Sequence, residues 1–73
     1  MTKLPVLSGA EVVKRLERAG WHRARQKGSP VVLLKRGHIA SLSVPQHREL
    51  APGTLRALIR ASGMTVEQFA ALR

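Results

Sequence analysis

The chain has 73 residues, of which 44% are hydrophobic, so it is long enough for one domain and too apolar for a disordered segment. It has no Cys, which excludes disulfides and thiolate metal sites and favours a cytoplasmic location. The net charge is +9, from thirteen Lys and Arg against four Glu, and such an excess favours a polyanionic partner.

The first predicted element is a helix over residues 9–19. Ser8 and Glu11 have the spacing of a capping box, in which each side chain satisfies the other residue's backbone N–H. Apolar residues then recur at helical spacing, and Gly20 predicts a left-handed stop. The preceding apolar stretch, residues 4–7, is too short for a signal peptide or a membrane span.

Three short strands are predicted over residues 21–27, 31–34 and 39–44. The turns between them, at 28–30 and 35–38, are tight enough for an antiparallel meander. In the third strand alternate residues are apolar, which predicts one buried and one exposed face.

The first strand carries its charge on alternate residues. Arg23, Arg25 and Lys27 therefore share one face. Trp21 has the same parity, so it either precedes the strand or lies across a bulge, and the sequence leaves both open. In the run 31–34 all four residues are apolar, so some face outward. This predicts a partner surface, unless the C-terminal helix covers it.

A second helix is expected from Pro52 to just before Gly63, after a loop at 45–51. Its predicted buried stripe is Leu55, Leu58 and Ile59, and Arg56 and Arg60 occupy a neighbouring face. A second capping box, residues 65–68, begins a short last helix. The expected architecture is α+β: one domain over residues 1–73, with helices on one face of a three-stranded antiparallel sheet in the order α-β-β-β-α and a short C-terminal helix.

Five short motifs occur along the chain in a specific order and spacing. They are Gly9 with Glu11, Ala19-Gly20 before Trp21, Gln26-Lys27-Gly28-Ser29, Val44-Pro45 with His47, and Pro52-Gly53-Thr54-Leu55. In these motifs the chain resembles the HicA family of small toxins, from bacterial and archaeal toxin–antitoxin pairs. The resemblance implies a double-stranded-RNA-binding-domain-like fold and an endoribonuclease that cleaves mRNA without a metal or other cofactor, inhibiting translation and growth. It also implies a HicB-like antitoxin that covers the active site.

The chain departs from this family at one position. The family pattern after residue 27 is Gly-Ser-His with a catalytic His, whereas this chain has Gly28-Ser29-Pro30. Imidazole can accept or donate a proton near neutral pH, and Pro has neither a titratable group nor a backbone N–H. We therefore expect a folded protein with impaired cleavage. One codon change converts His to Pro, which favours a substitution acquired during cloning, although natural divergence stays open.

The other candidate site residues surround this tripeptide. Gly28 is expected to permit a positive φ or a close backbone approach. Ser29 is expected to be a turn hydroxyl near the scissile phosphate, because no base–acid relay is identifiable for a nucleophile. The expected RNA-binding residues are Lys27, Arg25, Arg23, Lys35, Arg36 and His47.

The spacing of the three His residues does not match a metal site, and no Asp could join them.

Two further functions stay open beside the toxin. A non-catalytic RNA-binding module of the same fold is the main alternative, and Pro30 favours it. A DNA-binding role is weaker, because no helix-turn-helix pattern is present.

Overall fold

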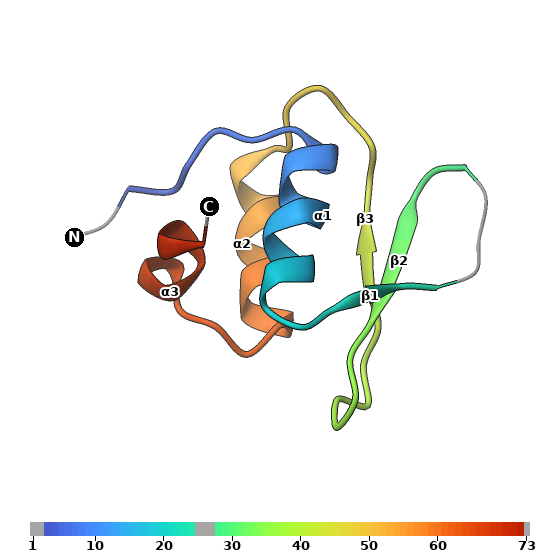
Figure 1. Ribbon diagram of the computed structural model, residues 1–73. Helices are drawn as coiled ribbons and strands as arrows, with labels where there is room; N and C mark the ends of the chain where they lie inside the picture. Colours follow the sequence, from blue (N-terminus) through green and yellow to red (C-terminus); the bar gives the residue numbers. More distant parts are fainter. Residues whose placement is uncertain (1–2, 25–27, 73) are drawn as a thin grey trace.

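The computed structural model describes residues 3–24 and 28–72 and has the predicted order of elements. Helices α1 and α2 lie on one side of the three-stranded sheet, and α3 lies beyond them, away from the sheet (Figure 1). The elements are α1 (Gly9–Arg18), β1 (His22–Arg23), β2 (Val31–Leu34), β3 (Leu42–Val44), α2 (Pro52–Ala61) and α3 (Val66–Ala71). The predicted α+β class and layer arrangement are confirmed.

Helix α1 begins at the predicted capping box. The Ser8 N–H donates to Glu11 Oε1 over 3.0 Å, and the Glu11 N–H donates to Ser8 Oγ over 3.1 Å. The hydrogen bond from the Ser8 backbone, and then that from its hydroxyl, hold the pKa of Glu11 below its usual value. The helix ends at Arg18, and Gly20 has the expected positive φ of 100°.

The first strand is shorter than predicted. β1 comprises His22–Arg23, and the Ala24 N–H continues the pairing by donating to Val32 O over 2.8 Å. Residues 25–27, the rest of the predicted strand, lie outside the described residues. Trp21 precedes β1 and is buried, so its parity requires no bulge.

The third strand is also shorter than predicted, because its pairing with β2 ends at Leu42. β3 pairs with β2 from Val31 opposite Val44 to Leu33 opposite Leu42. Residues 39–41 therefore belong to the connection and not to the sheet, and Ile39 is fully exposed. Within β3 the predicted alternation holds, with Leu42 and Val44 buried and Ser43 exposed.

The core includes both aromatic residues of the chain. Trp21 and Phe69 are almost completely buried, together with aliphatic residues from every layer. Phe69 comes from α3, whose main partner among the helices and strands is α2. Because α3 lies on the side of α2 away from the sheet, it does not cover the outer sheet face (Figure 1). Among the described residues, no helix is both long and apolar enough to cross a membrane.

Candidate functional site

The tripeptide Gly28-Ser29-Pro30 lies in the connection between β1 and β2, and all three residues are exposed. Gly28 has a φ of 85°, as its predicted role required, and a Cβ built there would meet nothing within 4 Å. The Ser29–Pro30 peptide bond is cis. The strand β2 begins directly afterwards, at Val31, so Pro30 stands at the end of the hairpin connection. The tripeptide is thus accessible to a large substrate.

The loop after β3 reaches this tripeptide. The backbone N–H of Gln46 donates to Ser29 Oγ over 3.3 Å, and the side-chain Nε2 of Gln46 donates to Val44 O over 3.0 Å. His47 follows directly and is exposed. The structure therefore brings the loop that carries His47 to the tripeptide, and the expected RNA contact of His47 stays a prediction. The structure gives Ser29 the role of a hydrogen-bond acceptor within the protein.

Of the basic residues predicted on the first strand, only Arg23 lies within the described residues. Arg23 is exposed, and its Nε lies 3.3 Å from Glu17 Oε2 on α1. A surface pair of this kind contributes at most about 1 kcal/mol, so it leaves Arg23 able to exchange partners. Arg25 and Lys27 lie outside the described residues. Their expected phosphate contacts stay predictions.

The register of the three strands places the charge of Arg23 and the exposed apolar residues on opposite faces of the sheet. Arg23 lies opposite Leu33, and directly paired residues point to the same face of a sheet. Leu33 is completely buried against the helices, so Arg23 belongs to the helix side. On the opposite face, His22 pairs with Leu34, which is half exposed, and Val32 pairs with the exposed Ser43. The outward apolar surface predicted from the run 31–34 is therefore present, on the face opposite Arg23.

Lys35 and Arg36 lie in the turn at the other end of β2 from the tripeptide. Lys35 Nζ is 6.0 Å from the centroid of the Trp21 ring, and the His38 ring is 5.0 Å from it. A four-residue strand spans about 13 Å at the usual rise per residue, so both cations are well removed from the tripeptide. Their expected RNA contacts would therefore involve a neighbouring part of the substrate.

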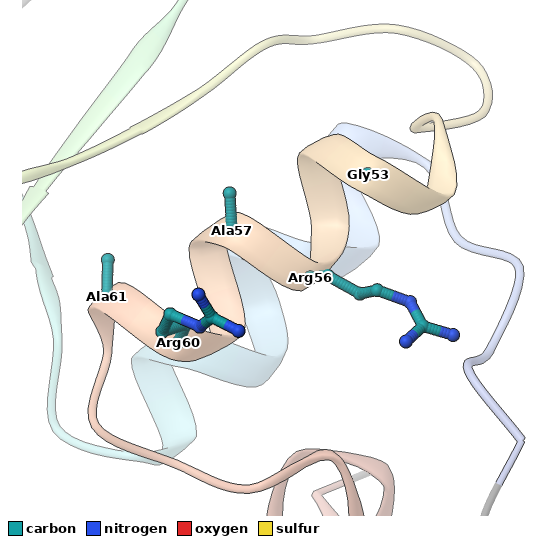
Figure 2. Close-up of a pocket in the computed structure, with 5 residues that line it drawn as sticks. All are labelled: Gly53, Arg56, Ala57, Arg60 and Ala61. Carbon is teal, nitrogen blue, oxygen red and sulfur yellow. The ribbon is translucent and has the colours of Figure 1, made fainter.

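A hollow on α2 contains two further arginines. Arg56 and Arg60 line it together with Gly53, Ala57 and Ala61, and Figure 2 shows both guanidinium groups extending from the helix. All five lining residues come from one helix, and none belongs to the tripeptide or to the loop at 45–51. The two arginines place positive charge at a separate part of the molecule. The sequence leaves open whether they extend a binding surface or only solvate the helix.

Two other residues make contacts near the tripeptide that the local sequence does not predict. The Gln46 N–H donates to Ser29 Oγ, and the Gly9 N–H donates to His47 O in the same loop. The sequence marks Gly9 only as a motif residue at the helix start, because a contact between distant segments has no local signature. The described residues contain no group of three His, Cys, Asp or Glu that could hold a metal ion.

The fold is a small α+β domain of the double-stranded-RNA-binding-domain type, with an exposed connection between β1 and β2. The family model described as "HicA toxin of bacterial toxin-antitoxin" matches residues 9–64, and the chain therefore belongs to the HicA toxin family. A chain from the solved "Toxin-Antitoxin complex from Streptococcus pneumoniae" is similar in structure, with a TM-score of 0.68 and 30% sequence identity. The match covers 80% of this chain and 98% of that one. No curated protein sequence matches the chain.

Proposed function

We propose that this chain is the RNA-directed toxin of a toxin–antitoxin pair, and that Pro30 impairs its cleavage of mRNA. The observation that carries the proposal is the exposed tripeptide at 28–30, within the stretch matched by the toxin family. Its architecture can present a reactive side chain to RNA, and the residue at position 30 has no group for proton transfer.

The chemistry explains why one side chain matters. In cleavage of RNA without a metal, the 2′-oxygen attacks phosphorus while the bond to the 5′-oxygen breaks. A base must take the 2′-hydroxyl proton, and an acid must supply a proton to the 5′-oxygen. Imidazole can fill either role near neutral pH, whereas the Pro ring can fill neither. The Ser29 hydroxyl, which accepts the Gln46 N–H, retains its own proton to donate to a phosphate oxygen.

RNA binding is supported by charge. The net charge of +9 on so small a domain attracts a polyanion, and each phosphate contact releases counterions. Lys27, Arg25 and Arg23 are the proposed contacts on the segment that leads to the tripeptide, and Arg23 exchanges its pairing with Glu17 for a phosphate. His47 is proposed to contact RNA near the tripeptide, because the neighbouring Gln46 N–H donates to Ser29 Oγ. Lys35 and Arg36 are proposed to contact more distant parts of the same RNA.

The proposed partner is an acidic antitoxin of the HicB type. It is supported by the similarity to a chain solved in a toxin–antitoxin complex and by the positive charge of this chain. The register of β2 with its neighbouring strands also suggests where this partner binds. A partner that covers Val32 and Leu34 lies on the outer sheet face and can extend along β2 to the tripeptide at its start. It does not need to reach Arg23, which lies on the other face.

The test is to restore an imidazole at position 30. Induced expression of the chain is expected to leave growth unaffected, and Pro30→His is expected to arrest growth and to cleave mRNA in vitro. Pro30→Ala is the matched control, because it also removes the ring but adds no titratable group. Cleavage by Pro30→His alone supports proton transfer at this position.

Two results would contradict the proposal. If Pro30→Ala cleaves RNA as well as Pro30→His does, the imidazole is not the missing group. If Pro30→His folds and binds RNA but cleaves none, the chain is better described as a non-catalytic RNA-binding module of the same fold. Folding of each variant is checked by the fluorescence of Trp21, the single tryptophan, which is buried.

A further inference from the structure

The loop after β3 is hydrogen-bonded at His47 and at Leu50 to the segment that leads into α1. The Gly9 N–H donates to His47 O over 2.9 Å, and the Leu50 N–H donates to Leu7 O over 2.9 Å. Leu7, Gly9 and Leu50 are buried. Because buried backbone hydrogen bonds are costly to break, this loop is held in one position relative to the helix.

Glycine at position 9 is needed for space and not for backbone conformation. A Cβ built on Gly9 would overlap the carbonyl oxygen of Pro45 and lie 2.9 Å from the Cα of Gln46. Both neighbours are backbone atoms, which cannot rotate away as the end of a flexible side chain can. The loop therefore approaches the first turn of α1 more closely than any other residue at position 9 would permit.

The same loop then holds the tripeptide. The Gln46 N–H donates to Ser29 Oγ, a contact between residues 17 positions apart in the sequence. Gly28 beside it is exposed, and a Cβ built there would meet nothing within 4 Å. A hydrogen bond from a fixed loop thus restricts a segment that the solvent surrounds.

We propose that Gly9 and Gln46 are positioning residues for the tripeptide: the start of α1 fixes the loop, and the Gln46 amide fixes Ser29. This device would hold the Ser29 hydroxyl and residue 30 in place against an RNA phosphate. The inference rests on the proposed function for its use. Its structural part, the link from Gly9 through Gln46 to Ser29, can be measured without any RNA.

The first measurement is hydrogen exchange at the Gln46 amide in the full chain. Ser29→Ala removes the acceptor, and exchange is expected to rise about 2- to 13-fold, the range that loss of one hydrogen bond produces. Ser29→Thr keeps the hydroxyl oxygen and is expected to keep the protection. Unchanged exchange in Ser29→Ala would overturn the link.

The second measurement uses a pair of matched glycine variants. Gly9→Ala is expected to displace the loop and to raise exchange at both Gln46 and Leu50. Gly53→Ala, in the first turn of α2, is the control, because a Cβ there meets nothing within 4 Å. If the two variants behave alike, the close approach at Gly9 does not position the loop.

The functional measurement is made in the Pro30→His background. Ser29→Ala and Gly9→Ala are expected to lower kcat by up to about 10²-fold, the cost of a small misplacement in an active site, with little change in KM. Ser29→Thr is expected to retain activity. If exchange rises but kcat stays unchanged, the link has no positioning role. If Pro30→His itself does not cleave RNA, the proposed function fails, and the exchange measurements still decide the link.

Discussion

Phe69 joins α3 to the hydrophobic core. We therefore expect Phe69→Ala to lower the free energy of unfolding of the whole domain. The helix lies beyond residues 9–64, the stretch that the toxin family matches. Even so, Phe69 has no exposed surface. Arg15 of α1 adds a second connection, since its Nη1 donates to Phe69 O over 3.4 Å and its guanidinium lies 5.6 Å from the centre of the ring.

The expected loss of stability can be compared with the free energy of unfolding of the whole domain. Replacing a buried Phe by Ala costs about 3–5 kcal/mol, through lost burial and the cavity that remains. A domain of 73 residues has a free energy of unfolding of about 4–11 kcal/mol at the usual stability per residue. Phe69→Ala therefore removes a large fraction of the stability. The melting temperature is expected to fall by at least about 12 °C.

Urea unfolding followed by Trp21 fluorescence and by circular dichroism measures this loss. Ile39→Ala is the control, because it deletes similar apolar volume from a fully exposed side chain and is expected to change stability by less than about 0.5 kcal/mol. A loss of under about 1 kcal/mol in Phe69→Ala would refute the argument. So would loss of exchange protection confined to α3, because the remaining core would then be stable without it.

Two further predictions concern α1 and the outer sheet face. The low pKa of Glu11 means that its contribution to stability is complete above 4.5, its usual value, and is lost as the pH falls through the folded-state value. Amide protection in the first turn of α1 should thus weaken in acid. It should not weaken in Glu11→Gln, nor at α3, where Gln68 completes the capping box; equal acid sensitivity at both helices would contradict this. On the sheet, Leu34→Ser is expected to weaken binding of the proposed HicB-like antitoxin more than about fivefold, as measured by titration calorimetry. Val6→Ser, at an exposed apolar residue of the N-terminal segment, should not, and equal effects would remove the outer face from the interface.

The helices could be predicted because their boundaries depend on neighbouring residues. Ser8 with Glu11, and Thr65 with Gln68, form their capping boxes across three positions in the sequence. Gly20 and Gly63 have the positive φ expected beyond a helix end. The strands could be predicted only in order and approximate place. The extent of β3 depends on how far β2 continues opposite it, which no local pattern specifies.

The candidate site, like the strands, could be predicted only in part from local sequence. The tripeptide and the loop with His47 were identified from local motifs, and the structure brings them together through Ser29 and Gln46. That contact could not be predicted, because it joins residues 17 positions apart and has no local signature in the sequence. The alternating charge over residues 21–27 can be recognised in the sequence, but the face on which Arg23 lies follows only from the register of β1 with β2.

That register places the proposed RNA contact Arg23 and the proposed partner surface on opposite faces of the hairpin. Arg23 lies on the helix side, near Glu17, whereas Val32 and Leu34 lie on the outer side. A protein partner gains most from desolvating the apolar outer face, since exposed ion pairs add little affinity there. RNA gains most from the cations, since phosphate contacts release counterions. The tripeptide directly precedes Val31 at the start of β2. The proposed antitoxin, seated on the outer face, could therefore cover the tripeptide without competing for every proposed RNA contact. Charge reversal at Arg23 should then affect RNA affinity more than antitoxin affinity.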